Sequence, residues 1–306
     1  MFREKLKQYV ESSSLVNMRE CGNGIYVLKY KKKVFYDNLW NEYIAECRGS
    51  IVDQDFNLVA YPFTKIYNYG IEKSAPVLAD DVRVTAYRKV NGFMVACTWY
   101  NGDVLISTTG STDSPYVDMA REMIGDNLDR YRKICKEYEG NTFMFECVHP
   151  RDPHIVPEQP GMYLLGMRKN EWCSPIEANA AIMMLLQNAF RTRIVQSFYT
   201  SMGQLLEEVK TVKHEGFVFY TDDGNVSSKL KSPYYLTAKW VARNPRTDKL
   251  LTNQFREQID EEYYPLLEHI RGNIEAYTVM DEQARLAWVR NYLESQVAGR
   301  NISCPT

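Results

Sequence analysis

The stretch VRVTAYRKVNGFMVACTWYNGDVLI, residues 82–106, alternates apolar and polar residues in three short runs. A period of two predicts half-buried β-strands, because successive side chains point to opposite faces of a strand. Asn101-Gly102 lies between the last two runs and is a strong signal for a two-residue hairpin turn. We therefore predict an antiparallel meander here, with Lys89 at the end of one strand.

Patterns outside this stretch predict a mixed α+β protein. Apolar alternation and turn residues predict further strands at 50–52, 143–148, 163–167, 216–220 and 226–230. Helical spacing predicts helices at 113–138 and 175–209, and again after about residue 245. We expect antiparallel sheets with flanking helices in a domain at 1–244, followed by a small helical C-terminal module at 245–306.

The bulk composition is that of an ordinary globular protein. The 306 residues are 45% hydrophobic and 25% charged, with a formal net charge of −2. A polyanionic partner would therefore need a local basic patch. Two clusters are candidates, although charge runs are also typical of solvated faces: Lys29, Lys31, Lys32 and Lys33, and then Lys229, Lys231, Lys239, Arg243, Arg246 and Lys249.

Seven widely spaced cysteines show no Cys-x-x-Cys pair, so we expect neither a zinc site nor a disulfide framework. Charges at Arg3, Glu4 and Lys5 stand where a signal peptide would need apolar residues, and no apolar run is long enough to cross a bilayer. We expect a cytoplasmic protein, with no membrane partner.

Lysines dominate the candidate site. Lys89 lies in Lys89-Val90-Asn91-Gly92, a tetrapeptide that fits either a solvated turn or a nucleophile. A lysine with a pKa near ~10.4 is a poor nucleophile unless neighbouring cations or a metal ion disfavour its charged form. Lys229 and Lys231 should share one face of a strand, with Leu230 pointing into the core. Because no acid lies within two residues of them, a phosphate is their natural ligand.

Two carboxylates and two upstream cations complete the set. Glu146 lies in an apolar strand, and Glu215 precedes Gly216, which permits a close approach of backbone or ligand. Each acid fits either a structural ion pair or a contact to a ligand such as a ribose hydroxyl or a metal ion. Arg48, beside a glycine, and Lys65 suit phosphate recognition but are equally typical of surface charges.

Taken in order, these segments resemble the motif series of covalent nucleotidyltransferases, most closely the phage RNA ligase 1 type of ATP-dependent RNA ligase. The series covers roughly residues 25–240, and its specificity lies in the order of the motifs. Its members here are Arg48-Gly49, Lys65-Ile66-Tyr67-Asn68, Lys89-Val90-Asn91-Gly92, Phe145-Glu146, the strand from Tyr163 to Arg168, Glu215-Gly216 and Lys229-Leu230-Lys231.

The resemblance implies a nucleotidyltransferase fold and a three-step reaction. Lys89 would attack the α-phosphate of ATP to give a lysyl-AMP. The AMP would then cap an RNA 5′-phosphate, and a 3′-hydroxyl would displace it to seal the strand. RNA repair, including tRNA repair, is the implied role. We expect a monomer, and a phage protein that acts in a host cell fits this role.

The same resemblance implies a role for each remaining site residue. Lys229 and Lys231 would hold the α-phosphate, and Arg48 and Lys65 would orient the β- and γ-phosphates. Glu146 would lie near the ribose and Glu215 at a Mg²⁺ or Mn²⁺ ion, with Glu146 as a second metal candidate. Further nucleotide contacts would come from Tyr67, Gly92, Gly216 and Tyr235. A site rich in cations with one or two carboxylates is what phosphoryl transfer requires.

Three features depart from the family pattern. Asn91 stands where an aspartate is more common, and Thr109 stands where some relatives place a phosphate-site lysine. The helical tail shows no motif of the tRNA-directed domain. A DNA-nick ligase or a capping guanylyltransferase would share the lysyl-nucleotide chemistry, although such relatives usually end in an OB barrel, a β structure. A non-catalytic RNA-binding protein would use the lysines only to grip phosphate.

Overall fold

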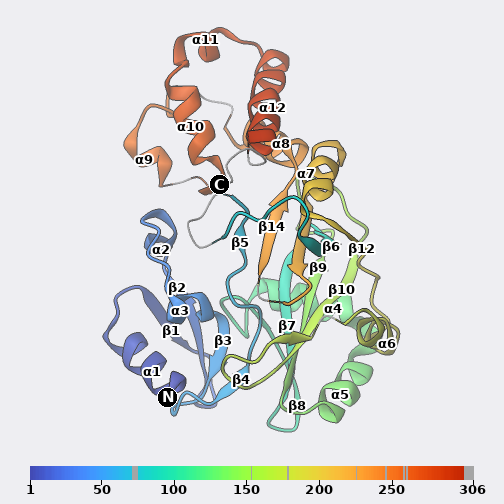
Figure 1. Ribbon diagram of the computed structural model, residues 1–306. Helices are drawn as coiled ribbons and strands as arrows, with labels where there is room; N and C mark the ends of the chain where they lie inside the picture. Colours follow the sequence, from blue (N-terminus) through green and yellow to red (C-terminus); the bar gives the residue numbers. More distant parts are fainter. Residues whose placement is uncertain are drawn as a thin grey trace. The chain divides into compact units, whose positions relative to one another are not determined.

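The structure is a computed structural model that describes residues 1–70, 75–152, 154–177, 179–224, 226–244, 247–257, 259 and 261–299. The chain forms two compact units, each discontinuous in sequence (Figure 1). Unit 1 contains residues 1–65 and 90–195, and unit 2 contains residues 66–89 and those from 196 onward. The chain therefore passes from unit 2 to unit 1 between Lys89 and Val90.

Unit 1 begins with a four-stranded antiparallel sheet in the order β1-β2-β3-β4. Its strands are β1 (Val16–Glu20), β2 (Tyr26–Tyr30), β3 (Arg48–Val52) and β4 (Leu58–Ala60), and the helices of this region are α1 (Phe2–Ser12), α2 (Lys32–Tyr36) and α3 (Glu42–Glu46). Leu6 of α1, Leu28 of β2 and Phe56 belong to one buried cluster. Of this sheet, the sequence predicted only the strand at 50–52.

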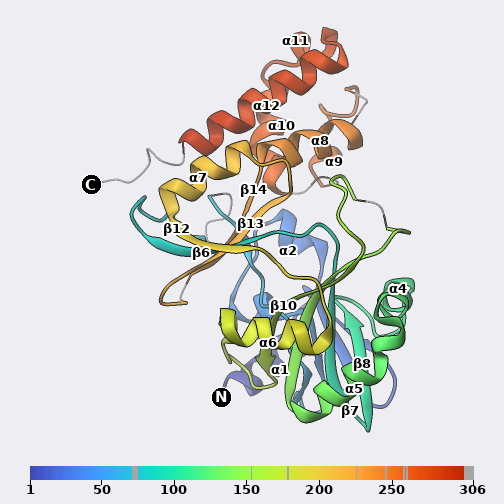
Figure 2. The same ribbon diagram turned by 90° about the vertical axis from the view of Figure 1, so that its right-hand side faces the viewer.

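The second sheet of unit 1 has the antiparallel order β11-β10-β9-β7-β8. Its strands are β7 (Phe93–Tyr100), β8 (Asp103–Thr108), β9 (Asn141–Val148), β10 (Gly161–Lys169) and β11 (Ile176–Glu177). Helices α4 (Pro115–Ile124), α5 (Leu128–Glu137) and α6 (Ala180–Phe190) cover one face (Figure 2). Phe143, Phe145 and Cys147 point into the core beneath these helices, as the alternation predicted.

Unit 2 contains a five-stranded sheet in the order β12-β6-β13-β14-β5. Its strands are β5 (Tyr67–Asn68), β6 (Arg83–Arg88), β12 (Ser197–Ser201), β13 (Gly216–Thr221) and β14 (Ser227–Lys231). All pairs are antiparallel except β14 with β5. Helix α7 (Met202–Thr211) packs Leu205, Leu206 and Val209 against this sheet.

The rest of unit 2 is helical. It contains α8 (Pro233–Arg243), α9 (Asn253–Arg256), a 3₁₀ turn at Glu261–Tyr263, α10 (Tyr264–Arg271), α11 (Ile274–Val279) and α12 (Glu282–Gly299). The predicted apolar stripe through Phe255, Tyr263, Leu266 and Ile270 is buried. Helix α12 packs on α7 and α8, so the helices continue the core of unit 2. The boundary at residue 244 stays a prediction.

The predicted α+β class on antiparallel sheets is confirmed, and so is the hairpin at Asn101-Gly102, which joins β7 to β8 with positive φ at both residues. The meander is wrong in its first strand. Strand β6 pairs with β12 and β13 of unit 2, whereas β7 pairs with β8 and β9 of unit 1. Alternation identifies a strand but carries no information about its partner.

Two helix predictions also need correction. The helix predicted at 113–138 is divided into α4 and α5 by a 3₁₀ turn at Gly125–Asn127, where Gly125 has a φ of +50°. The segment predicted as largely helical at 175–209 contains the strand β12, which forms the edge of the unit 2 sheet. In α6, Leu185 is 68% exposed, whereas the next residue, Leu186, is buried. None of the described helices is both long and apolar enough to cross a membrane.

Candidate active site

Lys89 and Glu215 form an ion pair in unit 2. Lys89 directly follows β6, and its backbone N–H donates to the carbonyl of Gly216 over 2.8 Å, which fixes it beside the start of β13. The Nζ atom lies 2.9 Å from Oε2 of Glu215. The Glu215 side chain is 5% exposed and that of Lys89 is 23% exposed. The candidate nucleophile is therefore accessible, and a largely buried carboxylate contacts it.

Gly216 makes this arrangement possible. Its φ is +132°, and a Cβ at this position would lie 2.0 Å from the carbonyl oxygen of Leu230 on the neighbouring strand. No residue with a side chain fits such a contact. The close backbone approach predicted for Gly216 is confirmed, and its partner is strand β14.

Strand β14 presents Lys229 and Lys231 on one face, as predicted. Leu230 is 1% exposed and packs in the core beneath α7. Lys229 pairs in register with Val218 on one side and with Asn68 of β5 on the other, so its backbone lies in the interior of the sheet. The two ammonium groups are thus held by a strand with partners on both edges.

Lys231 has an acidic partner that the sequence did not predict. Its Nζ donates to Oε1 of Glu262, which comes from the 3₁₀ turn that precedes α10. The Nζ of Lys239 lies 3.7 Å from the same oxygen, and Asn68 Nδ2 donates to Oε2 over 3.3 Å. The sequence places no acid within two residues of Lys231, and the fold brings Glu262 to it from further along the chain. A partner 31 residues away along the chain leaves no local signal.

The pKa shifts of this pair follow from burial and from charge. Burial raises the pKa of Glu262, but Lys231, Lys239 and Lys229 together outweigh it and lower that pKa to about 2. Burial lowers the pKa of Lys231, yet Glu262 and Glu215 raise it well above its ordinary value. Both groups are therefore charged near neutral pH.

Tyr235 lies against the same cations. It is in the first turn of α8, which begins at Pro233 and is capped by the hydroxyl of Ser232, the acceptor for the Tyr235 N–H. Its ring centroid is 5.9 Å from Nζ of Lys231 and 5.7 Å from Nζ of Lys239. These distances suit cation–π attraction. Tyr67 of β5 also lies in unit 2, paired with Ser228.

Glu146 and Gly92 are in contact in unit 1. Oε1 of Glu146 accepts a hydrogen bond from the N–H of Gly92 over 3.1 Å. A Cβ at Gly92 would lie 2.3 Å from the carbonyl oxygen of Cys147, so this glycine is required by the approach of β9. Asn91 is also in unit 1 and is 4% exposed. The tetrapeptide that begins with Lys89 is thus divided between the two units.

Lys65 lies in an aromatic enclosure of unit 1. Its Nζ is 4.4 Å from the ring centroid of Trp40 and 5.2 Å from that of Phe35, and the residue is only 6% exposed. Its backbone N–H donates to the carbonyl of Ala45 over 2.9 Å. These distances suit cation–π attraction, which holds the ammonium group beside the two rings.

A buried network supports the segment before Lys65. The hydroxyl of Thr64 donates to Oε2 of Glu46 over 2.8 Å and accepts from Nη1 of Arg168 over 2.9 Å. The Arg168 guanidinium stacks 3.5 Å from the ring centroid of Tyr61. Arg168 ends the predicted strand from Tyr163 to Arg168, and it contacts Thr64, the residue that precedes Lys65.

Arg48 lies opposite Lys29 across the β2–β3 pair, at a β-bulge whose extra residue is Gly49. Gly49 has a φ of +96°, and a Cβ there would lie 2.8 Å from Cα of Thr109. A Cβ at Gly110 would lie 2.8 Å from Nζ of Lys29. Lys29 thus places an ammonium group beside the backbone of Thr109-Gly110, where the threonine itself offers no cation.

Comparison with known proteins gives the family. A family model described as RNA ligase matches residues 46–235, which is more than half of the chain. The chain belongs to the RNA ligase family. The match includes every predicted site residue from Arg48 to Tyr235 and leaves the helices after α8 outside it. The family predicted from the order of the motifs is confirmed.

Two curated relatives of this RNA ligase family member come from viruses. An RNA ligase of Rhodothermus phage RM378 is 24% identical over 339 residues, covering 89% of this chain and 75% of the relative. A protein of Autographa californica nuclear polyhedrosis virus, named as a bifunctional polynucleotide kinase/RNA ligase, is 22% identical over 302 residues, covering 90% of this chain. The chain spans 40% of the length of that bifunctional relative.

Solved structures share the fold. An archaeal ATP-dependent RNA ligase has a TM-score of 0.59 at 16% identity, covering 97% of this chain and 78% of the other. A protein of Aquifex aeolicus, named as an ATP-dependent DNA ligase, has a TM-score of 0.54 at 16% identity, covering 94% and 76% of the two chains. The predicted nucleotidyltransferase fold is confirmed by these similarities.

The carboxylates of this RNA ligase family member fit a sparse metal site. Within the part of the chain that the structure describes, no three His, Cys, Asp or Glu side chains gather to hold a metal ion by themselves. Mg²⁺ is commonly bound through one or two carboxylates, with substrate phosphates and waters supplying the other ligands. Glu215, largely buried beside Lys89, suits that pattern in unit 2, and Glu146 is the corresponding candidate in unit 1.

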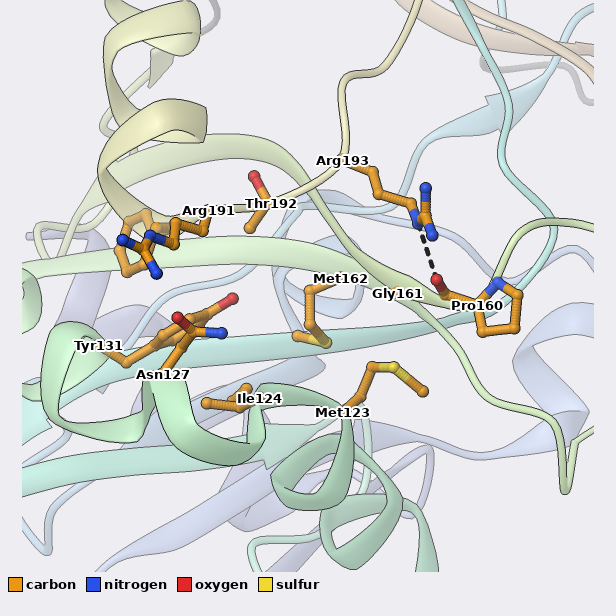
Figure 3. A pocket seen from close by; sticks show the side chains of 11 residues that line it. Met123, Ile124, Asn127, Tyr131, Pro160, Gly161, Met162, Arg191, Thr192 and Arg193 are labelled. Atoms are coloured by element: carbon orange, nitrogen blue, oxygen red, sulfur yellow. Dashed lines mark hydrogen bonds between the residues drawn. The ribbon is translucent and has the colours of Figure 1, made fainter.

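A cavity of about 360 Å³ lies elsewhere in unit 1 (Figure 3). It is lined mainly by α4, α5, the start of β10 and the end of α6, with Tyr131, Met162 and Arg191 among its side chains. Arg193 turns to the carbonyl of Pro160, to which its Nε donates over 2.7 Å. This cavity contains none of the predicted site residues, so it is separate from the candidate chemistry.

Proposed function

We propose that the chain is an ATP-dependent RNA ligase that works through a lysyl-AMP at Lys89. The observation that carries the proposal is the unit 2 cluster, which we define as Lys89, Glu215, Lys229, Lys231, Lys239 and Glu262. Four lysines and two glutamates give this cluster a net charge of +2. Such a surplus favours a phosphate group, and phosphoryl transfer depends mainly on positioning and charge neutralisation.

In the first step, the amine of Lys89 would attack the α-phosphorus of ATP. An N–P bond forms, the bond between the α-phosphorus and its bridging oxygen breaks, and pyrophosphate leaves. The Lys89 side chain is 23% exposed, and its ammonium group must first lose a proton to solvent; Oε2 of Glu215 lies 2.9 Å from its Nζ in this structure. A divalent metal ion bound at Glu215 would compensate that negative charge and add positive charge at the phosphates.

Two transfers would follow. An oxygen of the RNA 5′-phosphate attacks the same phosphorus, the N–P bond breaks, and AMP is joined to the RNA end. A 3′-hydroxyl then attacks the RNA phosphate, a phosphodiester forms, and AMP leaves. Lys229 and Lys231 would hold the α-phosphate through the first two steps, because both ammonium groups are fixed by the interior strand β14.

We propose that Arg48 and Lys65 orient the β- and γ-phosphates, and that Glu146 lies near the ribose and next to Gly92. Tyr67 and Tyr235 of unit 2 would contact the nucleotide through their rings. Lys29 would provide the cation that is missing at Thr109, since its Nζ lies beside Gly110.

The test is covalent labelling with ATP carrying ³²P in its α-phosphate, in the presence of Mg²⁺. We expect a labelled protein band that survives denaturation and is lost in Lys89→Ala. Lys213→Ala, an exposed lysine of unit 2, is the matched control and should keep the label. The proposal is wrong if the wild-type protein takes up no label, or if Lys89→Ala keeps it.

The acceptor is tested separately. Ends with a 5′-phosphate and a 3′-hydroxyl would be offered as single-stranded RNA, as a nicked anticodon stem-loop and as nicked duplex DNA. We expect the RNA substrates to be sealed, by a monomer acting inside the cell. Sealing of duplex DNA only would favour a DNA ligase, and labelling by GTP in preference to ATP would favour a capping guanylyltransferase. RNA binding that weakens with salt while no nucleotide is consumed would indicate a binding protein.

A further inference from the structure

Glu262 lies outside the matched family region, yet its carboxylate pairs with Lys231, a predicted phosphate ligand. It is contributed by the turn Glu261–Tyr263 in the helical part of the chain, and its side chain is 5% exposed. Two lysines and an amide converge on its two carboxylate oxygens: Lys231, Lys239 and Asn68. Glu262 is thus a buried carboxylate whose charge is compensated by two lysines and whose oxygens accept hydrogen bonds.

The turn that carries Glu262 is fixed in the core of unit 2. The hydroxyl of the next residue, Tyr263, donates to the carbonyl of Leu236 in α8 over 3.0 Å. The Tyr263 ring lies 5.1 Å from that of Trp240, which is fully buried. Glu262 is therefore attached to the same helix, α8, that follows strand β14 and carries Lys239.

Lys231 needs such a partner if it is to bind phosphate. Its side chain is 12% exposed, and Lys229 and Lys239 add positive charge around the same carboxylate. A buried ammonium surrounded by other cations tends to lose its proton, and a neutral amine attracts phosphate only weakly. One bond to Glu262 satisfies one of three N–H donors, so two remain for a ligand.

We propose that Glu262 is a positioning residue for the nucleotide site, which keeps Lys231 charged and aimed from strand β14 at the phosphate of the nucleotide. This inference rests on the proposed function, because it takes the ligand of Lys231 to be a phosphate of ATP. It extends the site into the helical segment after α8, to which the family match does not reach. That segment is then part of the nucleotide-binding machinery and more than an appendage for RNA recognition.

The first experiment measures ATP binding by calorimetry in a Lys89→Ala background, where no covalent step can occur. We expect Glu262→Gln to weaken ATP binding at least tenfold, Glu262→Asp to restore most of the affinity, and circular dichroism to stay unchanged. Glu268→Gln is the matched control, because Glu268 pairs with Arg271 at the surface of the same helical segment. Unchanged or tighter binding in Glu262→Gln would overturn the proposal, and tighter binding would mark Glu262 as a competitor of phosphate.

A double-mutant cycle separates positioning from a general structural effect. If Glu262 acts through Lys231, Glu262→Gln should change ATP affinity less than twofold once Lys231→Gln is present. Fully additive losses would overturn the proposal. If wild-type protein forms no lysyl-AMP while the cycle still shows coupling in ATP binding, the ligase proposal fails and the Glu262 inference stands.

Discussion

Single residues at the predicted phosphate site have functions that residue type alone does not reveal. Lys29 and Lys32 belong to one basic cluster in the sequence, and both are exposed. Only the structure distinguishes them, because Lys29 lies opposite Arg48 in the β2–β3 register and beside Gly110. Like charges directly opposite each other on two strands are destabilising unless an anion is shared between them.

Replacing Lys29 by alanine should therefore weaken nucleotide binding more than folding. We expect Lys29→Ala to raise the KM for ATP in lysyl-AMP formation about tenfold, which corresponds to ~1.4 kcal/mol. Lys32→Ala should leave this KM within about twofold. Equal changes of KM in the two variants would show that both lysines act only through the general positive charge of this surface. Chemical unfolding of both variants checks that stability is unchanged.

At the scale of elements, strand periodicity was informative and strand pairing was not. The hairpin β7–β8 follows from Asn101-Gly102, and the core face of β9 follows from alternation. The assignment of β6 to unit 2 depends on β12 and β13, which lie more than a hundred residues further along the chain. Long-range pairing is decided by complementary surfaces that no local window contains.

The junction of β13 and β14 gives a prediction at this scale. Gly216→Ala should destabilise the protein by at least ~2 kcal/mol, because the methyl group would meet the Leu230 carbonyl and force the strands apart. Gly224→Ala is the matched control, since Gly224 also has positive φ but has open space around its Cβ position; it should cost only ~1–2 kcal/mol. Urea unfolding of both variants measures the difference. Equal losses of unfolding free energy in the two variants would show that the positive φ of Gly216 causes the destabilisation, and not its close approach to the Leu230 carbonyl.

At the scale of the whole molecule, the two units divide the predicted site residues. Arg48, Lys65, Gly92 and Glu146 belong to unit 1, and the other seven belong to unit 2. The boundary at residue 244 stays a prediction, and the helices beyond it belong to unit 2, where α12 packs on α7 and α8 and Glu262 pairs with Lys231. Loss of the contact between Glu262 and the lysines should therefore lower the free energy of unfolding of the protein.

That contact predicts a specific acid sensitivity. The pKa of Glu262 is lowered to about 2 by Lys231, Lys239 and Lys229 against the effect of burial. A lowered pKa contributes stability that is present above the ordinary pKa of about 4.5 and is lost as the pH falls towards 2. We expect Glu262→Gln to lower the free energy of unfolding on the order of 2–3 kcal/mol at pH 7, and by roughly half of that or less at pH 3.

Urea unfolding at pH 7 and pH 3 measures this difference. Glu208→Gln, an exposed acid on α7, serves as the control and should change little at either pH. A difference between wild type and Glu262→Gln that is equally large at both pH values would show that the carboxylate charge is not what stabilises the fold.

The sequence by itself determined the family to which this protein belongs. The family follows from the order of its motif residues: Arg48, Lys65, Lys89, Glu146, Glu215 and the β14 lysines. Each motif is a short local segment, so it can be recognised without the fold. Period-two alternation also predicted which face of its strand each of the β14 lysines occupies. Only the tertiary structure decided which sheet each strand joins and which acid meets Lys231. Those outcomes depend on burial and charge between residues far apart in the chain, where no spacing rule applies.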